Sequence, residues 1–134
     1  MAEPQPQPRV LVVDDDPGVL QSLQLLLSDD CEVTICDAPR RALELAVSTP
    51  FDVIITDYKM PHMTGAEFAH QLSLRLSPTP YTLLLTGTPN EVKPQMPGAS
   101  ELVMVLAKPF DPQRLLNVVL QVGRLGINRR PLSL

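Results

Sequence analysis

The sequence predicts an α/β protein in which helices cover both faces of a five-stranded parallel sheet. Five short segments are almost entirely apolar, as expected for strands buried on both sides: 10–13, 32–36, 52–56, 81–86 and 101–107. Segments with apolar residues at helical spacing alternate with them, and this alternation is typical of doubly wound sheets. The 134 residues, 44% of them hydrophobic, are enough for one domain with its own core.

Helical patterns follow the first, second, third and fifth predicted strands. Their apolar residues recur three or four positions apart, which places them on one face of a helix: they span 19–27, 42–47, 68–76 and 115–120. Asp16-Pro17 and Asp111-Pro112 each place an N-cap acid before a proline, which marks the start of the first and last helix. Asp37 is expected to cap the second.

The segment after the fourth strand, residues 88–100, interrupts this pattern. A fourth helix belongs there, but Pro94 and Pro97 fall inside it. Because an interior proline costs a helix about 3 kcal/mol, we expect a short turn of helix or an irregular loop.

The two ends of the chain are expected to lie outside the domain. Residues 1–8 alternate polar residues with proline and are predicted to be a disordered lead-in. The domain itself is predicted over residues 9–122, and residues 123–134 are predicted to be a tail or the start of a linker.

Charge and composition argue against several classes of protein. The net charge is −4 and no basic stripe is visible, which disfavours direct nucleic-acid binding. No apolar run reaches the about 18 residues that span a membrane, and the N-terminus lacks the apolar core of a signal peptide. We therefore expect a cytoplasmic protein, in which Cys31 and Cys36 are free thiols without metal or redox spacing.

Polar residues gather at the carboxyl ends of the predicted strands: Asp14 and Asp15 after the first, Asp57 after the third, Thr86 at the fourth and Lys108 after the fifth. Ligands of doubly wound sheets bind beyond these ends, so we expect the five side chains to share one rim. Two carboxylates about 4 Å apart repel each other by about 4 kcal/mol at an effective dielectric of about 20. One lysine cannot offset three acids, but a divalent cation such as Mg²⁺ or Mn²⁺ could.

A cation beside a carboxylate, a hydroxyl and an ammonium group is suited to phosphoryl transfer. That reaction depends mainly on positioning and on neutralising charge. A carboxylate can itself act as the nucleophile that takes the phosphoryl group.

Four motifs on the predicted strand ends resemble the response-regulator receiver domain of bacterial two-component signalling. They are VVDDD at 12–16, ITDYKMPHMTG at 55–65, LLLTG at 83–87 and AKPF at 107–110. The resemblance covers roughly residues 9–122. It implies a flavodoxin-like fold with the strand order 2-1-3-4-5.

By this resemblance, Asp57 is the phosphoacceptor. Asp14, Asp15, Asp57 and the backbone carbonyl of Lys59 would hold Mg²⁺, and Thr86 and Lys108 would each contact a phosphoryl oxygen; these are the site residues that it implies. The family also implies a cis peptide bond between Lys108 and Pro109, and Gly65 suits a tight approach of the third helix. The chain would then not be an enzyme beyond its self-catalysed phosphorylation and dephosphorylation.

The resemblance also implies partners. The donor would be a sensor histidine kinase or a phosphotransfer protein. A partner protein or output domain would bind the face between the strand at 81–86 and the last helix, and a weak homodimer is a further option. One departure falls on this face, because Val105 stands where the family usually carries an aromatic residue, three positions before Lys108.

Two other functions compete with this interpretation. Asp14 and Asp16 form a D-x-D after an apolar strand, as in haloacid-dehalogenase-type phosphatases, whose nucleophile would be Asp14. That interpretation leaves Asp57 without a role, and the chain is short for a cap over the substrate. The second alternative is a pseudo-receiver, an interaction module that is never phosphorylated. The aspartate that becomes phosphorylated, if any, separates the three.

Overall fold

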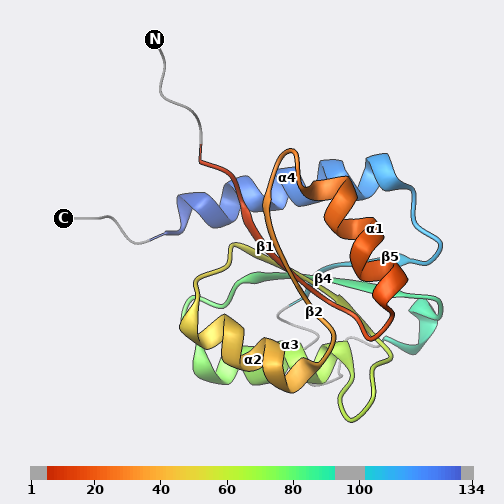
Figure 1. Ribbon diagram of the computed structural model, residues 1–134. Coiled ribbons are helices and arrows are strands. Elements are labelled where there is room, and N and C mark those ends of the chain that lie inside the picture. The colour runs from red at the N-terminus through yellow and green to blue at the C-terminus, as the bar shows by residue number, and fades with distance from the viewer. Residues whose placement is uncertain (1–5, 93–101, 131–134) are drawn as a thin grey trace.

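The computed structural model describes residues 6–92 and 102–130. Its centre is a parallel sheet in the order β2-β1-β3-β4-β5, which confirms the predicted flavodoxin-like topology. The strands are β1 (Arg9–Val13), β2 (Glu32–Cys36), β3 (Val53–Asp57), β4 (Tyr81–Thr86) and β5 (Leu102–Ala107). Helices α1 (Pro17–Leu27) and α4 (Pro112–Asn128) cover one face, and α2 (Pro39–Ser48) and α3 (Gly65–Arg75) cover the other (Figure 1).

The first strand shows why these segments are apolar throughout. Successive side chains of a strand point to opposite faces of the sheet. Val10 and Val12 accordingly pack with residues of α1 and α4, whereas Leu11 and Val13 pack with residues of α2 and α3. Both faces of β1 are therefore core.

The helix starts follow the predicted capping signals with one exception. Asp16 accepts the Gly18 N–H at 2.8 Å, and Asp111 accepts the Gln113 N–H at 3.3 Å, so both act as N-caps. The prediction for Asp37 is wrong: α2 begins one residue later than a cap at Asp37 would require, so that Ala38 is its N-cap and no side chain caps it.

The segment between β4 and β5 contains a single turn of 3-10 helix, η1 (Pro89–Glu91), within its described part. This agrees with the predicted short turn. Pro94 and Pro97 lie outside the described residues. No helix within the described ranges is long and apolar enough to cross a membrane.

The last helix continues to Asn128, past the boundary that we expected at residue 122. Two glycines in this part of α4 explain the close packing. A Cβ on Gly123 would lie 2.6 Å from the Pro8 ring, and a Cβ on Gly126 would lie 2.7 Å from the Cβ of Asp52. The absence of side chains at these two positions therefore lets α4 lie against the amino-terminal end of the sheet.

Pro8, expected within the lead-in, is buried, and its carbonyl accepts the Glu32 N–H at 2.9 Å. Residues 1–5 and 131–134 lie outside the described residues. Cys31 and Cys36 are free thiols, as predicted, and both are buried. Burial raises the pKa of the Cys31 thiol to about 11, so it stays protonated at neutral pH and is a poor nucleophile.

Candidate functional site

Asp14, Asp15 and Asp57 lie together at the carboxyl ends of β1 and β3. Each offers one carboxylate oxygen, and these oxygens lie within 4.8 Å of one another. The pairing of the two strands explains this, because Val13 is opposite Thr56 and the residues that follow both strands reach the same rim. Asp14 is buried, Asp57 is half-buried and Asp15 is exposed.

Lys108 brings a positive charge to the same rim. Its Nζ lies 2.9 Å from Asp57 Oδ1 and 3.4 Å from Asp14 Oδ2. Its backbone N–H donates to the Thr86 carbonyl at 2.7 Å, and its peptide bond to Pro109 is cis, as expected. Burial lowers the pKa of Lys108, but the hydrogen bond to Asp57 and the charge of Asp14 outweigh it, and the net shift is upward. The ammonium group therefore stays charged at neutral pH.

The surroundings of Asp14 disfavour the charged form of its carboxyl group. Its carboxylate is 2% exposed and accepts the Asp16 N–H at 2.9 Å. Burial raises the pKa of Asp14 above its ordinary value of 3.8, and the charge of Asp57 adds to this. The Asp16 N–H and Lys108 act in the opposite direction without cancelling the rise.

The donor set of this rim fits a small divalent cation. Three carboxylates and one ammonium group leave an excess of negative charge, and carboxylate oxygens are ligands that Mg²⁺ and Mn²⁺ accept. The exposure of Asp15 leaves room for the water molecules that Mg²⁺ retains.

Lys59 contributes no side chain to the three aspartates. Its Nζ lies 3.6 Å from Glu91 in η1, and its side chain is 64% exposed. Its backbone carbonyl is the candidate ligand that the family resemblance implies.

Gly65, the first residue of α3, lets the helix approach the carboxyl end of β3. Its N–H donates to the Tyr58 carbonyl at 2.8 Å. A Cβ at this position would overlap the Asp57 carbonyl oxygen and the Leu84 side chain. The capping box of Thr64 and Glu67 fixes the start of the helix at this point.

Two further residues lie beside this rim, and no sequence motif singled them out. Tyr58 is buried directly after Asp57 and packs in a small cluster with Leu84 and Val105. Thr88 bonds the hydroxyl of Thr86 through its N–H at 3.0 Å, and the two hydroxyl oxygens are 3.3 Å apart. The Thr-x-Thr spacing after a strand end is a signal for such a turn, whereas nothing in the local sequence indicates the burial of Tyr58.

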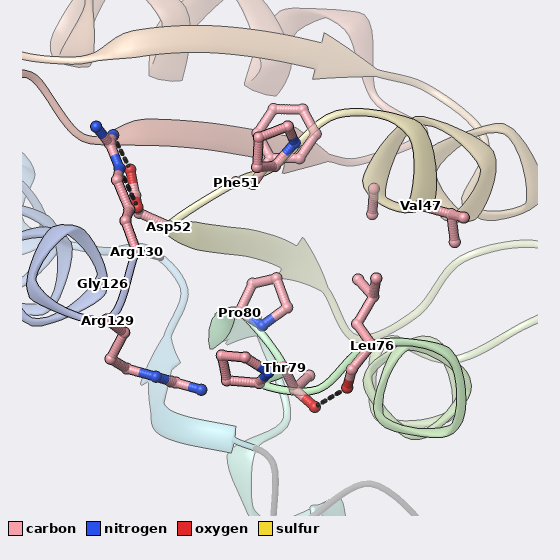
Figure 2. A pocket seen from close by; sticks show the side chains of 12 residues that line it. Val47, Phe51, Asp52, Leu76, Thr79, Pro80, Gly126, Arg129 and Arg130 are labelled. Carbon is pink, nitrogen blue, oxygen red and sulfur yellow. Dashed lines mark hydrogen bonds and ion pairs between the residues drawn. The ribbon is translucent and has the colours of Figure 1, made fainter. Parts of the chain in front are cut away.

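A pocket of about 250 Å³ lies at the opposite end of the sheet (Figure 2). Its lining includes the apolar side chains of Val47, Phe51 and Leu76. The acid that lines it, Asp52, is already paired with Arg130 at 2.6 Å. The pocket therefore lacks the excess of acids found at the three aspartates, and we place the candidate site at the aspartates.

The chain is similar in sequence to known proteins. The family model described as response regulator receiver domain matches residues 10–120. The chain is 35% identical over 125 residues to the two-component response regulator ORR3 of Oryza sativa subsp. indica, covering 87% of this chain and 94% of that protein. It is also 35% identical over 116 residues to the signal transduction histidine-protein kinase BarA of Escherichia coli (strain K12), covering 84% of this chain but 12% of BarA.

Solved structures show the same fold. The signal receiver domain of an HD domain-containing protein from Pseudomonas fluorescens Pf-5 superposes with a TM-score of 0.83 at 29% identity, over 97% of this chain and 96% of that one. The chemotaxis protein CheY4 of Vibrio cholerae superposes with a TM-score of 0.73 at 35% identity, over 87% of this chain and 99% of that one.

Proposed function

Because this chain belongs to the response regulator receiver domain family, we propose that it takes up a phosphoryl group on Asp57 and passes the signal to a partner protein. The observation that carries the assignment is the Lys108 ammonium group, 2.9 Å from the Asp57 carboxylate and bonded to Asp14 as well. Asp57 is also the more accessible of these two acids, with 12% of its side chain exposed against 2% for Asp14.

The reaction needs a carboxylate nucleophile and groups that neutralise charge. An oxygen of Asp57 attacks the phosphorus of a phosphohistidine, a P–O bond forms and the P–N bond breaks. The imidazole nitrogen keeps the electron pair of the broken bond. Lys108 stands where it can neutralise one phosphoryl oxygen, and the hydroxyl of Thr86 donates to another; position and charge supply most of the catalysis of such a transfer.

Asp14, Asp15, Asp57 and the Lys59 carbonyl are the residues that would hold Mg²⁺, or Mn²⁺ in its place. When bound, the ion would supply positive charge to the phosphoryl oxygens. This proposed metal site is supported by the three carboxylates, whose oxygens lie within 4.8 Å of one another. The chain's own residues then catalyse the phosphorylation and dephosphorylation of Asp57. A partner protein supplies the phosphoryl group.

The donor that we propose is a sensor histidine kinase or a phosphotransfer protein, met in the cytoplasm. The support is that the relative BarA is named as a histidine-protein kinase, of which this chain spans 12%. The face from β4 to α4 is the proposed binding face for an output partner, or for a second copy in a weak homodimer.

Intact-mass spectrometry after incubation with Mg²⁺ and acetyl phosphate tests this proposal. The parent chain should gain one phosphoryl group and Asp57→Asn none, whereas Asp16→Asn, a matched change of an acid outside the cluster, should be labelled like the parent. Labelling that survives Asp57→Asn and is lost in Asp14→Asn would favour the phosphatase-like alternative. No labelling by acetyl phosphate or by phosphohistidine donors would mean a pseudo-receiver.

A further inference from the structure

The hydroxyl of Thr86 is engaged by a neighbour that the proposed reaction does not use. Thr86 is the last residue of β4 and is 2% exposed. Its Oγ1 accepts the backbone N–H of Thr88 at 3.0 Å, and the Oγ1 of Thr88 lies 3.3 Å from it. Among the described residues, both groups that bond this hydroxyl therefore come from Thr88.

The direction of the bond between the two hydroxyls follows from their burial. A hydroxyl has one proton to donate and two lone pairs that accept. Within residues 6–92 and 102–130, only Thr88 is hydrogen-bonded to the Thr86 hydroxyl. Either hydroxyl could donate in this pair, and we assign the donor role to Thr86 because it is the more buried of the two. Thr88 is half-buried and can give its own proton to water, whereas a buried donor left without an acceptor is unfavourable.

We propose that Thr88 is a positioning residue whose hydroxyl holds the Thr86 proton in the unphosphorylated protein and competes for it with the phosphoryl group. This inference rests on the proposed function, in which the Thr86 hydroxyl donates to a phosphoryl oxygen. Thr86 has a single proton, so it cannot donate to Thr88 and to the phosphoryl group at once. Phosphorylation must therefore end the donation of this proton to the Thr88 oxygen.

The backbone of Thr88 is held independently of its hydroxyl. Its N–H bonds to Thr86, and its carbonyl accepts the Glu91 N–H at 3.0 Å in η1. Thr88→Val keeps both bonds and the β-branched shape and removes only the hydroxyl. The substitution therefore isolates the competition for the proton from the position of the turn.

Affinity for beryllofluoride, which stands in for the phosphoryl group on Asp57, tests the proposal in the presence of Mg²⁺. Thr88→Val should bind it more tightly, by between about two-fold and about ten-fold, the effect of one neutral hydrogen bond. Thr88→Ser restores the hydroxyl and should bind within about two-fold of the parent chain. Unchanged or weaker binding by Thr88→Val would overturn the proposal, because it would mean that Thr88 donates to Thr86 or does not compete.

A double-mutant cycle separates this role from a merely structural one. In a Thr86→Ala background, Thr88→Val should leave beryllofluoride affinity unchanged, since the contested proton is gone. An equal gain in both backgrounds would overturn the proposal. Thr79→Val removes a threonine hydroxyl at the other end of the sheet, one that donates to the Leu76 carbonyl at 3.1 Å, and should have no effect on affinity.

Failure of the proposed function has a different signature. The parent chain would then show no Mg²⁺-dependent beryllofluoride binding and no phosphoryl group at Asp57 by mass spectrometry, which overturns both inferences together. If Asp57 is labelled and only Thr88→Val gives the wrong result, the proposed function stands and the role of Thr88 falls. Thermal denaturation shows that each variant is folded, and Thr88→Ala replaces Thr88→Val if the latter does not fold.

Discussion

The two ends of β3 each present an aspartate to a basic side chain, yet they differ in charge balance. At the amino end, Asp52 meets the guanidinium group of Arg130, one acid with one base (Figure 2). At the carboxyl end, Asp57 shares the ammonium group of Lys108 with a second bonded acid and lies in a cluster of three. A buried acid is thus not by itself a sign of function. A cluster in which acids outnumber bases is the stronger sign.

Asp52 is satisfied by the protein alone. Its carboxylate accepts the Arg9 N–H at 2.8 Å and two N–H groups of Arg130, from Nε at 3.0 Å and Nη2 at 2.6 Å. The hydrogen bond to Asp52 raises the pKa of Arg130, which therefore stays charged. This bidentate pair ties the end of α4 to the sheet, and we assign it to stability.

The largest effect is expected at the balanced end. Arg130→Met should lower the free energy of unfolding by about 3 kcal/mol, because it leaves the Asp52 carboxylate buried without its cation. We expect the low end of the usual range since the Arg130 side chain is 31% exposed. Urea denaturation measures the difference.

Arg129→Met is the matched control for this measurement. Arg129 precedes the paired arginine and lies over the Tyr81 ring, 4.5 Å from its centroid. Loss of this contact should lower stability by only about 0.5–1 kcal/mol. Equal losses of unfolding free energy in the two variants would mean that the Asp52–Arg130 pair contributes no more to stability than the contact of Arg129 with Tyr81.

A smaller effect is expected from the glycines that contact the two ends of β3. Gly65→Ala should lower stability by about 2 kcal/mol, because the new Cβ overlaps backbone at Asp57. Gly126→Ala should lower it by about 1 kcal/mol, since alanine favours the helix and offsets part of the clash with Asp52. Thermal denaturation gives both values, and Gly87→Ala, with nothing within 4 Å of its Cβ, should be nearly neutral.

The unbalanced end should respond to Asp→Asn in the opposite sense. Without divalent cations at neutral pH, Asp14→Asn should raise stability by about 1 kcal/mol. This is a fraction of the about 4 kcal/mol repulsion of one like-charge pair at about 4 Å, since Lys108 already offsets part of it. Asp52→Asn should instead lower stability by about 3 kcal/mol. A loss of stability in Asp14→Asn would contradict the proposed excess of charge.

The pH dependence of this gain has a definite sign. The pKa of Asp14 is raised in the native state, so the native state holds this proton more tightly than the unfolded chain. Stability from Asp14 is therefore present at acidic pH and falls as the pH rises from the ordinary value of 3.8 through the native pKa. Urea denaturation across this range should show Asp14→Asn and the parent chain converging at about pH 3 and diverging above it.

The sequence predicted the carboxyl end of the sheet far better than the amino end. Asp14, Asp57 and Lys108 could be placed together because parallel strands end at one rim of the sheet. A residue that directly follows such a strand in the sequence must lie at that rim. The pair of Asp52 and Arg130 joins residues 78 positions apart, and no local pattern marks such a contact. The bond from Thr88 to Thr86 depends on the conformation of the turn, which propensity does not specify.

The measurement that tests the central claim most directly is the change in melting temperature on adding Mg²⁺. Binding to the native state alone raises stability by mass action. The account predicts a rise for the parent chain, a much smaller rise for Asp15→Asn, and a full rise for Asp16→Asn, which changes the neighbouring N-cap acid to another good N-cap residue. Equal rises in all three proteins would contradict the claim that the three-aspartate cluster is built to hold a cation.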